Sequence, residues 1–165
     1  MSWRYAHEGY VLQGLGREDL LSQYLLAFFA SRQCTGVAIR LAMDWALLQA
    51  SKKQVVVSGF HSPLEQSVLT VLLQAKSPVV AVVARPVSEA KLQSTWLEAV
   101  QEGRMAVLSR DKNTGRLTVA QAAVRNNLVA TLAQKIVIAH ASPGGQLERS
   151  CETWYQAGRL IERLT

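Results

Sequence analysis

The sequence predicts an α/β protein in which a doubly wound, mostly parallel sheet forms a single domain. Five short apolar runs have the length and composition of buried strands, and a stretch with helical periodicity follows each of them. This alternation is typical of parallel sheets with helices on both faces. The chain has 165 residues, which suits one domain with a hydrophobic core better than two.

The predicted strands cover residues 24–29, 54–57, 78–84, 104–108 and 135–139. Before them, residues 1–23 are polar, contain three glycines and show no sustained period. We therefore expect an N-terminal arm or a short lead-in helix over residues 1–23, followed by one domain over residues 24–165.

Helical spacing follows the first two strands. The predicted buried face of a helix over 37–49 consists of Val37, Leu41, Trp45 and Leu48. After the second strand, an N-cap serine, a proline at the first helical position and a glutamate three residues after the cap form a capping box. These residues are Ser62, Pro63 and Glu65, and they predict that a helix begins here.

The three later helices are placed by the same criteria. The third begins at Ser88, buries Leu92, Trp96 and Val100, and ends at Gly103. The fourth covers residues 117–133 and buries Val129, Leu132 and Ala133. The fifth covers residues 146–156, buries Leu147, Cys151, Trp154 and Tyr155, and ends before Gly158.

Candidate binding residues follow the strands, because open parallel sheets bind ligands beyond the carboxyl ends of their strands. The candidates after the first two strands are Ser31, Arg32, Thr35, Gly36, Ser58, Gly59, Phe60 and His61. Those further along the chain are Arg85, Arg125, Asn126, Gly144 and Gly145. Arg125 and Asn126 lie on the fourth helix, where the alternative is a solvent-facing turn.

These residue types suit a phosphate ligand. Arg32 and the start of the first helix would attract a phosphate group, and Gly59 would allow the backbone to approach a ligand. Phe60 would either stack on a base or fill the core. The chain lacks the glycine-rich motifs of dinucleotide cofactors and nucleoside triphosphates, and Cys34 and Cys151 lack zinc-site spacing. We therefore expect no cofactor and no metal.

The charge distribution also favours an anionic partner. Residues 31–135 carry 13 Lys or Arg against 6 Asp or Glu. A basic excess is typical of proteins that bind phosphates, nucleotides or nucleic acids, although a solvated basic surface is the alternative. No apolar run is long enough to cross a bilayer, so we expect a cytoplasmic protein without a membrane partner.

Several motifs resemble the Rossmann-like core of the DNA-processing protein A (DprA/Smf) family, in the wider SMF/DprA-LOG superfamily. They are Ala30-Ser31-Arg32, VVVSGFHSPLEQSVLTVLL, AVVARPV and AVRNNLVATLAQKIVIAHASPGG. The resemblance covers residues 24–160 and implies single-stranded DNA binding by Arg32 and by a lysine near the third strand, which would be Lys76. It also suggests a homodimer.

Two hypotheses therefore remain. The first is a binding module, without catalytic residues, for single-stranded DNA or another nucleic-acid backbone. The second is a nucleotide-handling enzyme or sensor related to the phosphoribohydrolase branch of the superfamily, with Arg125 and Glu148 acting on a ribosyl bond. The chain keeps Pro143-Gly144-Gly145 but lacks the Gly-Thr pair of that branch. We expect the binding module.

Overall fold

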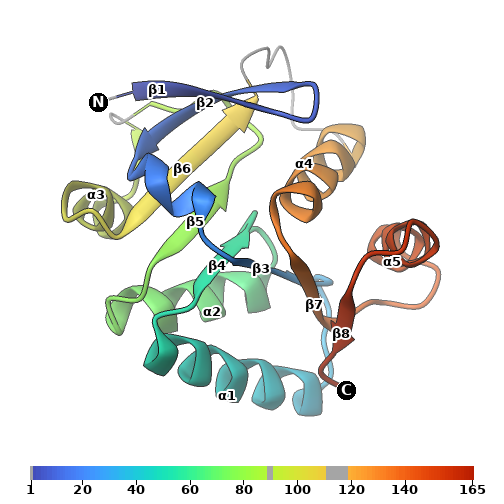
Figure 1. The fold of residues 1–165 in the computed structure, drawn as a ribbon. Helices are drawn as coiled ribbons and strands as arrows, with labels where there is room; N and C mark the ends of the chain where they lie inside the picture. Colours follow the sequence, from blue (N-terminus) through green and yellow to red (C-terminus); the bar gives the residue numbers. More distant parts are fainter. Residues whose placement is uncertain (1, 89–90, 111–118) are drawn as a thin grey trace.

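The protein is described by a computed structural model that covers residues 2–88, 91–110 and 119–165. In these residues eight strands form one sheet, in the order β1-β2-β6-β5-β4-β3-β7-β8 (Figure 1). The five predicted strands are its central part, and neighbours among them run parallel. The predicted fold class, a doubly wound, mostly parallel α/β sheet, is confirmed.

The strands are β1 (Ser2–His7), β2 (Tyr10–Gly16), β3 (Leu25–Ala30), β4 (Val55–Ser58), β5 (Val79–Val82), β6 (Met105–Arg110), β7 (Lys135–His140) and β8 (Ile161–Arg163). The helices are the 3-10 helix η1 (Glu18–Ser22) and the α-helices α1 (Gly36–Lys52), α2 (Pro63–Gln74), α3 (Ser94–Gln101), α4 (Val119–Leu132) and α5 (Gln146–Gln156).

Both faces of the sheet are buried. In β3, Leu25, Ala27 and Phe29 belong to one hydrophobic cluster. The alternate residues Leu26, Phe28 and Ala30 belong to the other. Successive strand residues point to opposite faces, so a strand buried on both sides is apolar throughout. The first cluster includes residues of η1, α4 and α5, and the second includes residues of α1, α2 and α3.

The expected N-terminal arm is wrong, because this segment extends the sheet. β1 and β2 form a hairpin, and β2 pairs antiparallel with β6. Glu8 and Gly9 have φ values of 46° and 84°, and a turn with both residues in the left-handed region suits the twist of a hairpin. Glu-Gly is not one of the usual turn pairs, so the sequence carries no clear hairpin signal. Of the expected arm, only η1 resembles a lead-in helix.

The predicted buried face of α1 is partly wrong. Val37 and Leu48 are 54% and 51% exposed, and Ala38, Ala42 and Ala46 are buried instead. Small side chains let a helix approach its neighbours closely, so α1 packs through its alanines and Trp45. In the part of the chain that the structure describes, no helix is both long and apolar enough to cross a membrane.

Two other helix predictions also need correction. α3 begins at Ser94 rather than Ser88, and Leu92 reaches the core from the loop before it. In α5 the predicted bounds are confirmed, but Tyr155 is 70% exposed, because Leu147, Cys151 and Trp154 already form the buried stripe. The capping box of α2 is confirmed, with both of its hydrogen bonds present.

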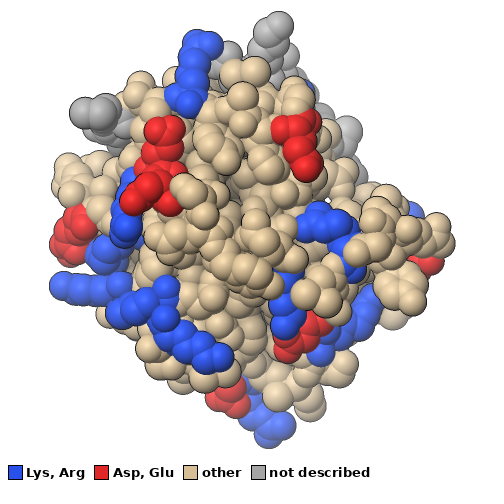
Figure 2. Space-filling model, in the orientation of Figure 1, with Lys and Arg blue, Asp and Glu red and all other residues tan. Residues whose placement is uncertain are grey.

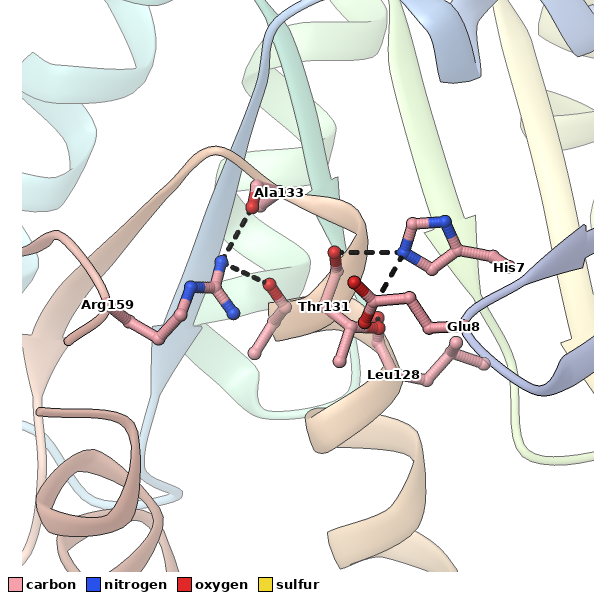
Figure 3. Close-up of polar contacts among 7 residues, drawn as sticks. His7, Glu8, Leu128, Thr131, Ala133 and Arg159 are labelled. Atoms are coloured by element: carbon pink, nitrogen blue, oxygen red, sulfur yellow. Dashed lines mark hydrogen bonds and ion pairs between the residues drawn. The ribbon is translucent and has the colours of Figure 1, made fainter. Parts of the chain in front are cut away.

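The C-terminal end of α4 is held by side chains from both ends of the chain (Figure 3). An Arg159 Nη atom donates to the carbonyl oxygens of Ala130 and Ala133, at 2.7 and 2.6 Å. The His7 ring nitrogen lies 3.1 Å from the Thr131 carbonyl oxygen. Because the last carbonyls of a helix have no partner within it, these contacts anchor α4 between the hairpin and β8.

Replacing Arg159 by alanine should therefore destabilise the fold. Two carbonyls would lose a charged donor at the negative end of the helix dipole, and the expected loss is about 1–3 kcal/mol in the free energy of unfolding. Urea denaturation followed by circular dichroism measures it. Arg159→Lys should recover part of the loss, and an unchanged Arg159→Ala midpoint would contradict this role.

Candidate functional site

A cavity of about 370 Å³ lies at the carboxyl edge of the sheet, where the strand order reverses direction. β3 lies between β4 and β7, so its carboxyl end is the topological switch point of the sheet, where open α/β folds bind ligands. Six predicted site residues line this cavity: Ser31, Arg32, His61, Arg125, Asn126 and Gly145. We call it the switch-point cavity.

Arg125 is the most buried cation of the switch-point cavity. It is only 8% exposed, and its Nε finds no hydrogen-bond partner among the described residues. Its Nη2 lies 3.5 Å from Asn126 Oδ1. Burial lowers the pKa of the Arg125 guanidinium from its usual value, while the Glu65 carboxylate opposes that shift. Arg125 lines the cavity, and a guanidinium there is suited to bind an anion.

His61 lies close to two cations. Partial burial lowers the pKa of His61 from its usual value, and Arg125 and Arg32 lower it further. Positive charge on all three groups is therefore unfavourable without a ligand, and a bound anion would relieve that repulsion. The His61 ring and the Arg32 side chain are both exposed, so both can reach a ligand.

Glu65 organises the floor of the cavity. Its Oε2 accepts from the Ala30 backbone N–H at 3.0 Å, and its Oε1 accepts from those of His61 and Ser62 at 2.9 and 3.2 Å. It thereby joins the end of β3 to the start of α2. Burial raises the pKa of Glu65, while the three backbone donors and Arg125 oppose that rise. The sequence indicated the capping box but not the bond to Ala30.

Most of the predicted hydroxyl groups hold the loops rather than remain free for a ligand. Ser31 Oγ accepts from the Ser142 backbone N–H at 2.8 Å, which joins the β3–α1 and β7–α5 loops. Thr35 caps α1, which begins at Gly36, by accepting from Ala38 N–H at 3.1 Å. Ser58 Oγ accepts from the Phe60 N–H at 3.0 Å. These hydrogen bonds hold the loops that carry Arg32 and His61.

The start of α5 forms part of the cavity wall. Gly145, Gln146 and Leu147 line it, and no side chain in the described part of the protein caps this helix. Gly144, at φ 73°, donates its N–H to Glu148 Oε1 at 2.9 Å. Glu148 is exposed and does not line the cavity, so its carboxylate stabilises the loop. A helix N-terminus attracts anions, which adds to the effect of the arginines.

Eight of the fourteen predicted site residues do not line the switch-point cavity, and Phe60, Arg85 and Lys76 are among them. Phe60 is 4% exposed and packs in the hydrophobic cluster below α1, α2 and α3, so it fills the core and its ring is not available to stack on a base. Arg85 lines a separate cavity of about 260 Å³ near α3. Lys76 precedes β5 and therefore lies at the amino edge of the sheet, opposite the switch-point cavity.

The amino edge is itself basic. The Lys53 ammonium donates to the carbonyl oxygens of Ala75 and Lys76, and Arg104 donates to that of Leu73. Figure 2 shows Lys and Arg side chains gathered at the lower left, where Figure 1 places α1, α2 and the start of β5. Part of the basic excess in the sequence therefore lies away from the switch-point cavity.

The structure also brings residues into the cavity that sequence reasoning did not select. Ser142, Gln146 and Leu147 come from the β7–α5 loop and the start of α5, and Ala122 and Ala123 come from α4. Of these residues, only Ser142 carried a signal in the sequence, because it follows a predicted strand. In the described ranges, no group of three or more His, Cys, Asp or Glu residues is placed to hold a metal ion.

The fold and the cavity define the class of protein: a Rossmann-like α/β domain with a cavity lined by arginines at its switch point. Residues 3–150 match the family of DNA recombination-mediator protein A. The chain therefore belongs to that family. No curated protein sequence matches it.

Solved structures support the same fold. DNA processing protein A from Streptococcus pneumoniae superposes with a TM-score of 0.74 at 19% identity, over 99% of this chain and 62% of that one. The Helicobacter pylori protein of the same name gives a TM-score of 0.77 at 15% identity, over 99% and 80%. A molybdenum cofactor carrier protein from Chlamydomonas gives 0.57 at 10% identity, over 86% and 75%. The chain thus spans less than two thirds of the pneumococcal protein.

Proposed function

We propose that the switch-point cavity binds the phosphate backbone of single-stranded DNA, and that the protein is a binding module rather than an enzyme. The observation that carries the proposal is the pair of arginines beside His61. Arg125 is buried, Arg32 is exposed, and both line the same cavity as His61. Guanidinium groups and helix N-termini both bind phosphate.

Membership of the family of DNA recombination-mediator protein A supports this ligand. The Helicobacter pylori structure with the same fold is reported for the single-stranded DNA binding mode of that protein. The open cavity also suits a strand that continues beyond it, because Arg32 and His61 are exposed at its rim.

The enzymatic alternative has less support from the geometry. Glu148, the carboxylate it requires, lies outside the switch-point cavity and accepts from Gly144. Among the described residues that line the cavity, Glu65 is the one carboxylate, and both of its oxygens accept backbone N–H groups. Glu65 is buried, and three of the roughly four lone-pair sites of its carboxylate already accept backbone N–H groups, so it is poorly placed to act as a general base on a substrate.

Replacing Arg32 by alanine should weaken single-stranded DNA binding for every sequence tested. The slope of log affinity against log salt concentration should also become less negative, by about 0.7 for each phosphate that the variant no longer neutralises. Fluorescence anisotropy with a labelled oligonucleotide at several salt concentrations measures both.

Lys76→Ala is the matched control, because it removes one positive charge at the amino edge of the sheet. It should leave the affinity and the salt dependence close to those of the parent. Equal losses in the two variants would indicate binding by general charge, and parental affinity in Arg32→Ala would disprove this site.

A further inference from the structure

We infer that a second cavity, beside Trp96, holds a nucleobase of the strand whose phosphates occupy the switch-point cavity. This inference rests on the proposed function. The second cavity has a volume of about 260 Å³ and lies between the loop that follows β5 and helix α3. We call it the Trp96 cavity, and its lining includes Val83, Arg85, Lys91, Leu92, Trp96 and Val107.

The chemistry of the Trp96 cavity suits a flat ring next to phosphate. Val83, Leu92 and Val107 give it an apolar wall, while the exposed cations Arg85 and Lys91 are also part of its lining. The volume lies below the roughly 300–1,000 Å³ of sites for drug-sized ligands, which fits one ring system better than a larger ligand. Each base in a nucleic-acid strand has a flat apolar face, and anionic phosphates of the backbone lie on either side of it.

Trp96 offers the stacking surface that Phe60 does not. Phe60 is buried, whereas Trp96 is half-buried and lines both the Trp96 cavity and the cavity between α2 and α3. The Trp96 indole therefore forms a wall that these two cavities share. Stacking on an aromatic side chain tolerates every base, which suits binding without sequence preference.

The two sites lie along the same carboxyl edge of the sheet. A small hollow lined by Val83, Arg110 and Arg125 shares Arg125 with the switch-point cavity and Val83 with the Trp96 cavity. β3 and β5 are separated by β4, so their ends lie roughly 10 Å apart at the usual strand spacing. A strand could therefore cross from Arg32 to Trp96 in a few nucleotides.

The loop that forms the Trp96 cavity is anchored to the sheet. Val87 N–H donates to Ser109 Oγ, at the end of β6, at 3.2 Å, and Val87 also packs against the core. The Trp96 ring comes from α3, whose Ala99 is fully buried. In Figure 1, α3 lies beside β6, away from α5. Val87 and α3 are thus both held against the sheet beside the cavity.

The experiment compares thymidine oligomers with abasic oligomers of equal length, using the parent and the Trp96→Leu variant. Leucine keeps an apolar side chain against the core but removes the aromatic face. Trp96→Leu should weaken binding of the thymidine oligomers roughly 5- to 150-fold, without changing the salt dependence. It should leave binding of the abasic oligomers unchanged.

Oligomer length gives a second readout. The parent should gain affinity once the oligomer is long enough to reach both cavities, and Trp96→Leu should lose that gain. Tyr24→Leu is the control, because Tyr24 is 51% exposed and precedes β3, at the amino edge of the sheet. Its affinities should match the parent.

The outcomes separate the two proposals. If the parent binds thymidine oligomers and Trp96→Leu binds them equally well, the nucleobase site is wrong and the phosphate site stands. If Trp96→Leu weakens thymidine and abasic oligomers alike, Trp96 acts through the fold and the nucleobase site is wrong. If the parent binds no oligomer, both proposals fail.

Discussion

Replacing Glu65 by glutamine is expected to lower the free energy of unfolding by about 3 kcal/mol. The Glu65 oxygens accept from the backbone N–H groups of Ala30, His61 and Ser62 in a buried position. A glutamine side chain has one oxygen, so its NH₂ group must face at least one buried donor. The variant also removes the negative charge that acts on Arg125. Chemical denaturation followed by circular dichroism measures the loss.

Glu102→Gln provides the control for this experiment. Glu102 is an exposed carboxylate that pairs with Arg104 at the surface, at 2.9 Å, and surface pairs contribute little to stability. Its denaturation midpoint should stay close to that of the parent. If Glu65→Gln were equally stable, the carboxylate would not be what joins β3 to α2.

Replacing Gly59 by alanine is expected to weaken single-stranded DNA binding by about 1–3 kcal/mol, although no charge is changed. A Cβ at position 59 would lie 2.7 Å from Arg125 Nε and 3.1 Å from its Cδ. Such a contact is too short, so the buried guanidinium must move away from its position in the switch-point cavity. Fluorescence anisotropy with a labelled oligonucleotide measures the change in affinity.

Gly36→Ala is the matched control, because a Cβ there meets nothing within 4 Å. Gly36 is the first residue of α1, and alanine is the better helix former, so this variant should fold at least as well as the parent and bind equally. Parental affinity in Gly59→Ala would show that the position of Arg125 does not matter for binding.

The central fold was predictable because its signals are local. Each parallel strand is buried on both faces and is therefore apolar throughout, and the start of α2 carries a complete capping box. The edge strands were not predictable in the same way. β1 alternates between exposed and half-buried residues, β8 has only 3 residues, and the β1–β2 turn uses Glu8 and Gly9, an uncommon pair.

Topology also explains which predicted site residues come together. Arg32, His61 and Gly145 follow parallel strands, so the carboxyl-edge rule predicted that they are neighbours. Lys76 was placed by resemblance alone, and the direction of β5 puts it at the other edge. The assignment of Arg125 needed the structure, because a helix position can face solvent or cavity equally well.

The sequence by itself determined the class of fold, the five central strands, and the edge at which a ligand should bind. The spacing of apolar residues and the helix caps specify these features, and both signals lie within short segments of the chain. Only the tertiary structure decided that Phe60 and Glu65 are buried, that Ser31 and Ser58 hold loops, and that Arg125 keeps a donor free. Burial and hydrogen-bond partners depend on segments distant in the sequence, so local patterns cannot specify them.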